Sequence, residues 1–473
     1  MKSIAAQHRN VVWIIADQHR AQCLGWNGDP NVRTPNIDNL IRNGTNFSRA
    51  VAGAPWCTPF RGALLTGQYP HQTGVVRTPS RLDPKFPTIA DAFNAAGYHS
   101  VWIGKWHVAG SNRASHVVPP ELRGRFDYWL GYENNNKQND VWVHGTGCEA
   151  PRRLDDYEVP GLTGLFEEHL TAHVRGGGGA GRGGGAAGPG SDYQPFFAAL
   201  SVQPPHSPYV PPHHADGPNP ASVELRRNVP PVDWIETRAR RDVAGYSSMV
   251  ESVDAAVGRV REILRRLGVD RETYIIYMSD HGDMLGSHGQ WEKSSPWEES
   301  VRIPFVVGTA GGQEHMHVGE YHYPLNHVDI APTTLGLCGI PTPPEMVGYD
   351  FSPLITEGPQ ALHSDVPARK PPTAALLQQI TRKFHPHSVN RAWRGVVTAD
   401  NWKYVCTPNN DWLLHDLSRD PYELANLCYD VTFQERKEQL HGELQRLLRE
   451  NGDEFELPSI DLSDHAATGG DNG

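Results

Sequence analysis

The stretch "VVWIIADQH" (residues 11–19) is a short apolar run that ends in Asp17 and Gln18. Its apolar residues are continuous, and a strand with this pattern is typically covered on both faces, as in a parallel sheet between helices. Three more runs have the same form: "SVWIGKWH" (100–107), "FFAALSVQPPH" (196–206) and "TYIIYMSDHGD" (273–283). We therefore expect an α/β fold with a large mixed, mostly parallel sheet sandwiched by helices.

Helical segments lie between these runs. "TPNIDNLIRNG" (34–44) has Pro35 at the first helical position and Gly44 as a stop, and residues 238–268 have helical periodicity up to Gly268. In open α/β sheets, ligands bind at the carboxyl ends of the strands. The polar residues that end the four runs should therefore meet at one edge of the sheet.

The chain is long enough for two domains. Its 473 residues exceed what one core usually supports, and "SDVPARKPP" (364–372) is a Pro-rich break. We predict a catalytic α/β domain at 1–365 and a smaller α+β domain at 366–473, with antiparallel strands, a closing helix and a disordered tail. The Gly-rich tract 175–191 is not followed by Gly-Lys-Ser/Thr, so we expect a flexible insertion rather than a phosphate loop.

The net charge and the lengths of the apolar runs limit which classes of binding partner are expected. A formal net charge of −11 argues against a general nucleic-acid binder, which needs clustered Lys and Arg. The early apolar run 11–16 is too short for a signal peptide or a membrane span, so we expect a cytoplasmic protein without a membrane partner. The six cysteines are scattered, with no zinc-type spacing. Disulfides are therefore not expected.

Candidate metal ligands follow two of the runs. Asp17 and Gln18 end one run, and Asp280 and His281 end another. Two carboxylates and an amide oxygen suit Ca²⁺ or Mg²⁺, while the His281 nitrogen favours Mn²⁺, so the pattern leaves the ion open.

A second group of candidates is cationic. It consists of Lys105, His107, His206 and Lys293. Beside a metal site, such a pocket would hold an anionic ester and stabilise the charge that develops on it.

Cys57 stands at the start of a helix-like stretch, "CTPFRGALLTG" (57–67). A thiolate nucleophile would need a histidine base, which the fold could bring from elsewhere. The stretch also resembles the signature of the type I sulfatases, of the alkaline phosphatase superfamily, which is Cys-x-Pro-Ser-Arg followed by an apolar helix and Thr-Gly. The resemblance continues through "GKWHVAG" (104–110), "VQPPHSPY" (202–209), "SDHGDMLGSHGQWEK" (279–293) and "LHDLSRDPYELANL" (414–427).

The resemblance implies an alkaline phosphatase-like fold and hydrolysis of a small-molecule or saccharide sulfate ester. In that family a maturation enzyme oxidises the cysteine to formylglycine. One hydroxyl of the hydrated aldehyde attacks sulfur and the alcohol leaves; the second hydroxyl then collapses the sulfated enzyme intermediate and expels sulfate. One divalent cation assists, with Ca²⁺ as the first candidate and Mn²⁺ or Mg²⁺ as alternatives.

The same resemblance assigns roles to residues of this chain. Arg61 and Lys105 would orient and polarise the diol, and His107 would take its proton. His206 and Lys293 would bind the sulfate group and protonate the leaving oxygen. The metal ligands would be Asp17, Gln18, Asp280, His281 and the modified Cys57.

Two departures from the family pattern keep other functions open. Phe60 stands where serine is usual, and Gln18 and His281 stand where many members have Asp and Asn. The latter pair resembles a branch with phosphonate monoester hydrolases and choline sulfatases. The alternatives are therefore a phosphonate monoester or phosphodiester hydrolase on the same site, an unmatured, non-catalytic binder of sulfated ligands, and a cysteine hydrolase that uses Cys57 directly.

Overall fold

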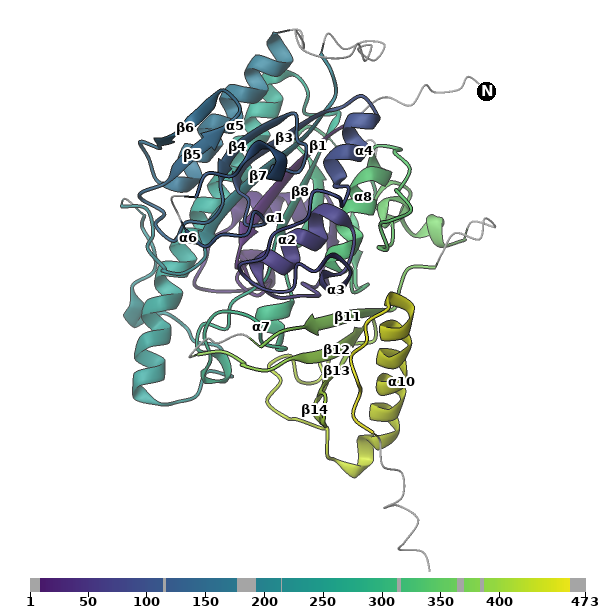
Figure 1. The fold of residues 1–473 in the computed structure, drawn as a ribbon. Coiled ribbons are helices and arrows are strands. Elements are labelled where there is room, and N and C mark those ends of the chain that lie inside the picture. The colour runs from purple at the N-terminus through teal and green to yellow at the C-terminus, as the bar shows by residue number, and fades with distance from the viewer. Residues whose placement is uncertain are drawn as a thin grey trace, which may run out of the picture.

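The computed structural model describes residues 9–113, 116–176, 193–213, 215–312, 316–363, 370–382 and 387–459. Figure 1 shows a large sheet between helices and, below it, a second sheet with one long helix. The expected α/β fold with a smaller antiparallel sheet is confirmed. The Gly-rich insertion expected at 175–191 lies, from residue 177, outside the described residues, as does the tail from residue 460.

The large sheet has the strand order β10-β2-β9-β8-β1-β7-β3-β4-β5-β6. Its central strands β8, β1, β7, β3 and β4 run parallel, and β9, β5 and β6 are antiparallel to their neighbours. The bounds are β1 Asn10–Asp17, β2 Thr45–Phe47, β3 His99–Lys105, β4 Tyr128–Tyr132, β5 Trp142–Gly145, β6 Cys148–Arg153, β7 Phe196–Pro205, β8 Thr273–Ser279, β9 Phe305–Thr309 and β10 Gly319–Tyr321.

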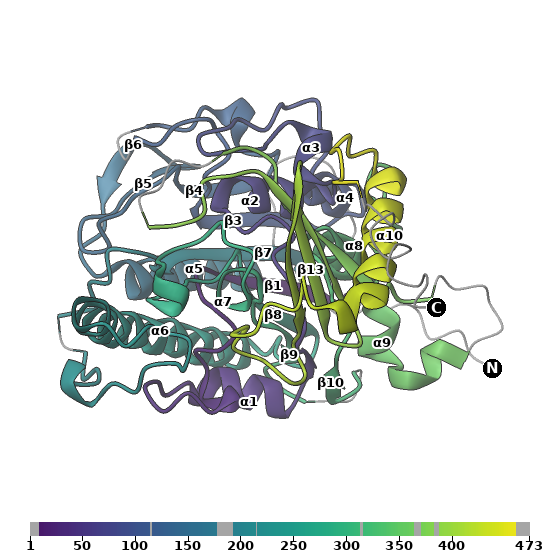
Figure 2. The same cartoon turned by 90° about the horizontal axis from the view of Figure 1, so that it is seen from below.

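Helices cover both faces of this sheet (Figure 2). The long helices α5 and α6 pack on one face with α1, while α2, α4 and α8 lie on the other. The bounds are α1 Pro35–Arg42, α2 Cys57–Thr66, α3 Pro70–Thr73, α4 Ile89–Ala95, α5 Glu158–Arg175, α6 Asp233–Leu267, α7 Glu298–Val301, α8 Ile330–Leu337 and α9 Ser352–Thr356. No helix among the described residues is both long and apolar enough to cross a bilayer.

Strand β1 shows why its sequence is continuously apolar. Successive side chains of a strand point to opposite faces, so each face of β1 contributes to a different core. Val11, Trp13 and Ile15 belong to the core under α2, α4 and α8. Val12, Ile14 and Ala16 belong to the core under α1, α5 and α6. Both faces of β1 are therefore buried, as the sequence predicts.

The carboxyl ends of the central strands converge on one edge. Asp17 ends β1, which lies between β7 and β8, and Lys105 ends β3 on the far side of β7. His206 directly follows β7, and Asp280 directly follows β8. The parallel arrangement thus places these four polar side chains at the same edge of the sheet.

The second sheet has four antiparallel strands in the order β11-β12-β13-β14. It comprises β11 Ala374–Gln379, β12 Trp393–Thr398, β13 Trp402–Thr407 and β14 Asn410–Asp416, and α10 (Gln434–Asn451) packs against it. Strand β11 was not among the segments that sequence patterns indicated. One apolar cluster contains Leu444 of α10, residues of this sheet and Ala63 of α2. The smaller sheet and α10 therefore also support the helix that begins at Cys57. The domain boundary proposed after residue 365 falls within 364–369, outside the described residues.

A buried ion cluster links the second sheet to α7. Lys403 of β13 is fully buried, and its Nζ lies 3.0 Å from Glu298 Oε1 of α7 and 2.6 Å from Glu423 Oε1. Replacing Lys403 with methionine should lower the free energy of unfolding by about 3–5 kcal/mol, because the buried Glu298 carboxylate would lose the cation that it contacts.

Denaturant unfolding measures this effect. Lys85→Met is the matched control, since the Lys85–Asp83 pair is exposed and such pairs contribute about 1 kcal/mol or less. A Lys403→Met shift no larger than that of the control would contradict the prediction.

Candidate active site

Cys57 is the first residue of α2, and local sequence explains why the helix starts and stops where it does. Trp56 before it is extended, and Gly67 after it adopts φ 62°, a left-handed conformation that ends a helix readily when the residue is glycine. A Cβ on Gly62 would lie 2.9 Å from Val75, so glycine lets α2 pack closely. Cys57, only 2% exposed, is thereby held at a helix N-terminus, where partial positive charge favours an anion.

Four potential metal ligands surround the Cys57 position. The ligand atoms of Asp17, Cys57, Asp280 and His281 all lie within 4.8 Å of one another, and all four residues are buried. Cys57 Sγ is 3.1 Å from His281 Nε2 and 3.6 Å from Asp17 Oδ1. His281 Nδ1 donates to the carbonyl oxygen of Gly282 (3.0 Å), and Nε2 is the ring nitrogen that faces the group.

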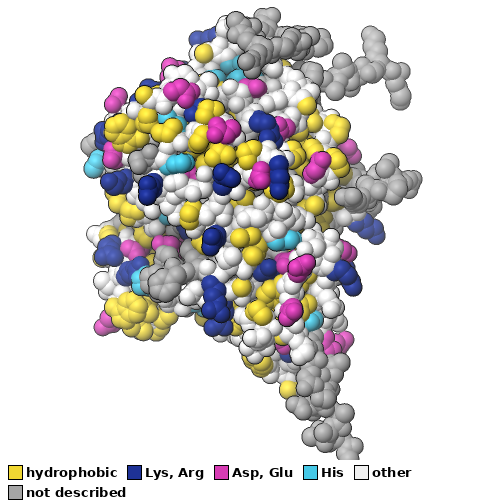
Figure 3. Space-filling model, in the orientation of Figure 1, with side chains coloured by type: hydrophobic (Ala, Val, Ile, Leu, Met, Phe, Trp, Pro, Cys, Tyr) yellow, Lys and Arg dark blue, Asp and Glu magenta, His cyan; other side chains and the backbone are white. Residues whose placement is uncertain are grey.

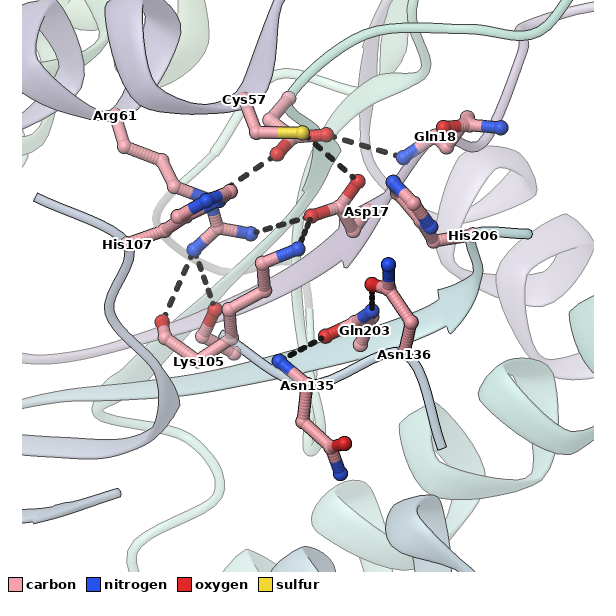
Figure 4. A network of polar contacts seen from close by, with 12 residues as sticks. Asp17, Gln18, Cys57, Arg61, Lys105, His107, Asn135, Asn136, Gln203 and His206 are labelled. Carbon is pink, nitrogen blue, oxygen red and sulfur yellow. Dashed lines mark hydrogen bonds and ion pairs between the residues drawn. The ribbon is translucent and has the colours of Figure 1, made fainter. Parts of the chain in front are cut away.

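Two cations hold the carboxylates in place (Figure 4). Arg61 is fully buried and donates from Nε to Asp280 Oδ2 (3.1 Å) and from Nη2 to Asp17 Oδ2 (3.4 Å). Its Nη1 donates to the Lys105 carbonyl oxygen (3.0 Å) and Ser201 Oγ (2.9 Å). Lys105 Nζ lies 2.6 Å from Asp17 Oδ2. Arg61 therefore connects the ends of β1 and β3, the middle of β7 and the residue after β8.

The pKa values of the two buried carboxyl groups are shifted in opposite directions. Burial alone would raise the pKa of Asp17, but Lys105, His206 and Arg61 overcome it and hold that pKa well below its usual range. Burial, with Asp17 nearby, raises the pKa of Asp280 to about 6. Because the two carboxylates crowd each other, Asp280 resists ionisation.

A divalent cation fits this group. The donors are two carboxylate oxygens, a histidine nitrogen and the residue-57 atom, and a cation among them would offset the repulsion between Asp17 and Asp280. Burial opposes ionisation of the Cys57 thiol, but Lys293, His281 and Lys105 lower its pKa well below its usual range. The position of residue 57 thus favours a negatively charged atom.

Gln18, Lys293 and His206 form a connected chain beside this group. Lys293 Nζ donates to Gln18 Oε1 (2.7 Å) and lies 2.5 Å from His206 Nε2. His206 Nδ1 donates to the Ser207 carbonyl oxygen (2.6 Å), so its Nε2 is the acceptor for Lys293. Gln18 Nε2 donates to Asp283 Oδ2 (2.5 Å). In this arrangement the Gln18 amide links Lys293 to Asp283.

His107 approaches Cys57 from the loop after β3. It is 4% exposed, has φ 63°, and its Nε2 lies 3.5 Å from Asn112 Oδ1. Burial, with the Lys105 charge, lowers the pKa of His107 to about 4, although Cys57 opposes this. The imidazole is therefore neutral near neutral pH and can accept a proton.

Sequence reasoning missed several residues that support the site. Ser201 lies in the middle of β7 and gave no signal, yet it binds Arg61. Gln203, two residues further on, accepts from the backbone N–H of Asn135 (3.3 Å) and donates to Asn136 Oδ1 (2.7 Å). The asparagine run in "GYENNNKQND" (131–140) was the available signal for this network.

A cavity of about 280 Å³ adjoins this network. It shares Asn135 with it and is further lined by Lys137, Trp142, His144 and His116, among others. Trp142 is 46% exposed. The cavity thus offers an aromatic face and polar groups close to the candidate active site.

Phe60 does not face the reacting groups. Its side chain is fully buried, and its ring stacks on His327 with centroids 5.5 Å apart. The residue that departs from the sulfatase signature therefore serves the packing of α2 in the folded protein.

Comparisons with known proteins agree with this geometry. The family model "Sulfatase" matches residues 9–171 and 188–340, and the model "N-sulphoglucosamine sulphohydrolase, C-terminal" matches residues 286–450. An ulvan-active sulfatase of Formosa agariphila is 31% identical over 450 residues, covering 94% of this chain and 82% of its own. An endo-4-O-sulfatase of Bacteroides thetaiotaomicron is 29% identical over 519 residues, covering 97% and 95%.

A solved structure shares the architecture. It comes from work on metabolism of multiple glycosaminoglycans by Bacteroides thetaiotaomicron, and it superposes with a TM-score of 0.79 at 27% identity, covering 95% of this chain and 97% of that one. The family model spans more than half of the chain. This protein therefore belongs to the sulfatase family of the alkaline phosphatase superfamily and is an enzyme of the sulfuric ester hydrolase class.

Proposed function

We propose that the chain hydrolyses a sulfate monoester with a formylglycine derived from Cys57 and one divalent cation. The observation that carries this proposal is the buried group of Asp17, Cys57, Asp280 and His281 at the N-terminus of α2, with Lys293 and His206 beside it. The hydrated aldehyde supplies the nucleophilic hydroxyl, and the cation supplies charge neutralisation for it and for a sulfate oxygen. Ca²⁺ is our first candidate, with Mn²⁺ and Mg²⁺ as alternatives.

The chain's own residues then have distinct tasks. Arg61, fixed by four hydrogen bonds, holds the carboxylates of Asp17 and Asp280 beside residue 57. Neutral His107 accepts the proton of the residue-57 hydroxyl. Lys293 donates to His206 Nε2, so this pair can hold an anionic sulfate and pass a proton to the leaving oxygen. Gln18 remains a proposed metal ligand through its amide oxygen, which also accepts a hydrogen bond from Lys293.

A saccharide is the substrate class that we favour. The relatives carry names such as ulvan-active sulfatase and endo-4-O-sulfatase. The cavity with Asn135, Lys137 and Trp142 also supports a sugar, because an aromatic face can pack on a sugar ring while polar groups bind its hydroxyls. The partner that matures Cys57 would be a formylglycine-generating enzyme.

Parallel assays test the reaction. The chain, expressed with a formylglycine-generating enzyme, would be offered sulfated oligosaccharides, an aryl sulfate, an aryl phosphonate ester and a phosphodiester. We expect the highest kcat/KM on a sulfate ester. A clear preference for phosphorus would favour the phosphonate monoester or phosphodiester hydrolase. No turnover on any ester, with an unmodified thiol at residue 57, would favour the non-catalytic binder.

Asp283 provides a test of how Gln18 is positioned. Its Oδ2 accepts from Gln18 Nε2 (2.5 Å) and the Tyr209 hydroxyl (2.7 Å), and its Oδ1 accepts from the backbone N–H groups of Leu285 and Glu292. Asp283→Asn removes an acceptor and should weaken metal affinity about 10–100-fold, as loss of residues that orient ligands generally does.

Calcium titration of the chelator-treated protein measures that affinity. Tyr209→Phe, which removes one hydrogen bond to Asp283 and leaves the carboxylate, should have a smaller effect. Melting temperatures in excess chelator separate metal affinity from folding. An unchanged apparent Kd for Asp283→Asn would contradict the predicted role.

A further inference from the structure

A cavity of about 410 Å³ lies where the loop after β1 meets the segment after β14. We name it the arginine cavity, because five arginines line it: Arg20, Arg49, Arg226, Arg227 and Arg302. None of the ten candidate site residues lines it. Arg20 nevertheless follows Gln18 by two residues and packs against Gly282, next to His281, since a Cβ on Gly282 would lie 3.0 Å from Arg20 Cβ.

Three of these arginines, Arg20, Arg49 and Arg227, have no protein acceptor among the described residues. Arg20 is 2% exposed, yet its side chain forms no hydrogen bond or ion pair with any described residue, and its Nε is buried without a partner. Burial opposes its charge, but Cys23, Asp29, Tyr246 and Glu299 raise the pKa of Arg20 without forming a hydrogen bond or ion pair with its side chain. The half-buried Arg49 side chain likewise has no hydrogen bond or ion pair within the described part of the chain. Buried charges are ordinarily paired, so these guanidinium groups call for an anion.

None of the lining carboxylates forms an ion pair with Arg20 or Arg49, although Glu298 attracts Arg49 from a longer distance. Three acidic residues, Asp29, Glu224 and Glu298, accompany the five arginines. Asp29 accepts from the backbone and side chain of Asn31, and Glu298 is held by Lys403. Arg302 lies 3.8 Å from Glu298, and burial together with the like charges of Arg49 and Arg226 lowers its pKa despite that carboxylate. The guanidinium groups therefore repel one another, and a bound anion would relieve this repulsion.

The rest of the lining suits a small polar ligand. The Tyr422 ring lies under Arg226 and Arg227, at 4.9 and 5.8 Å, and Asn27, Asn31 and Gln22 add hydrogen-bonding groups. On the face shown in Figure 3, basic and acidic side chains are interspersed. The five arginines of the cavity belong to a chain with a formal net charge of −11, so its cationic character is local and favours a compact ligand over an extended polyanion.

We propose that the arginine cavity is a second anion site, which binds a tetrahedral sulfate-type oxyanion, free or carried by a sugar, through Arg20, Arg49, Arg227 and Arg302. Guanidinium groups match such oxyanions in charge and geometry, because two N–H groups can bind two oxygens in parallel. This site does not depend on catalysis at residue 57, and it can exist whether or not the chain hydrolyses sulfate esters.

A crystal soaked with sodium selenate tests the location. Selenate replaces sulfate, and selenium is located by anomalous scattering. We expect one peak within hydrogen-bonding distance of Arg20 and Arg49, in addition to any peak near Lys293. A soak with no selenium in the arginine cavity overturns the proposal.

Calorimetric titration with sodium sulfate, against sodium chloride at equal ionic strength, tests the side chains. Arg49→Gln and the double variant with Arg227→Gln should weaken one binding event, by about tenfold or more for each guanidinium that is lost. Neither side chain has an ion pair within the described residues, so both variants should fold. Arg152→Gln, on exposed β6 at the other edge of the large sheet, is the control for loss of one positive charge. If the arginine variants bind sulfate with the same affinity as the Arg152→Gln control, the proposed site is refuted.

Competition identifies the source of the oxyanion. In a Cys57→Ala background, which prevents turnover, glucose 6-sulfate and glucose would each be titrated against sulfate. Stronger competition by glucose 6-sulfate than by sulfate indicates a sugar-borne group, and the reverse indicates free sulfate. Equal competition by unsulfated glucose overturns oxyanion recognition. If the chain hydrolyses no sulfate ester but holds selenate in the cavity, only the proposed function fails.

Discussion

Replacing Cys57 with alanine is expected to lower kcat/KM on a sulfate ester by about 10⁴-fold or more, because the proposed nucleophile is lost while the surrounding charges remain. The side chain is buried at the start of α2 among Asp17, Asp280 and His281. Alanine fits this space, so the fold should persist. Initial rates on the best sulfate ester, together with the thermal melting curve, separate lost chemistry from lost structure.

Cys406→Ala is the matched control. Cys406 is also fully buried but lies in β13, within the core of the smaller sheet, and should retain full activity. Mass spectrometry of the peptide with residue 57 should show conversion of the thiol to an aldehyde in the active wild-type enzyme. A Cys57→Ala enzyme that keeps wild-type rates would refute the proposed nucleophile.

Removal of divalent cations by a chelator is the second large effect that we expect, with loss of essentially all turnover. Asp17 and Asp280 are buried together, and burial with Asp17 raises the pKa of Asp280 to about 6. Without a cation, the negative charge on residue 57 and on a sulfate oxygen would no longer be neutralised beside these two carboxylates. Adding Ca²⁺, Mg²⁺ and Mn²⁺ back separately would identify the ion by the rate that it restores.

The same experiment separates the sulfatase from a cysteine hydrolase. A thiolate nucleophile needs no cation and would survive chelation. The chelator saturated with calcium beforehand is the control for direct inhibition. The cation should also raise the melting temperature, since a ligand at 100 times its Kd stabilises the native state by about 2.7 kcal/mol. Full activity after exhaustive chelation would contradict a metal-assisted reaction.

The placement of most candidate residues could be predicted from the sequence. Asp17, Lys105, His206 and Asp280 each end or directly follow a strand, so local patterning alone placed them together at one edge of a parallel sheet. Lys293 follows no strand and was identified through the family resemblance. Its contact with His206 depends on a loop whose course local sequence does not specify.

The sequence by itself determined the strand cores, the helix that begins at Cys57 and the family, because apolar periodicity, glycine positions and short motifs are local properties. Only the tertiary structure decided which charges are paired. Arg61 meets Ser201, and Gln18 connects Lys293 to Asp283, across long sequence separations. The arginine cavity likewise brings together side chains from Arg20 to Tyr422. The physical reason is that burial and charge pairing depend on distances in space, which the chain sets only when the sheet and its loops have packed.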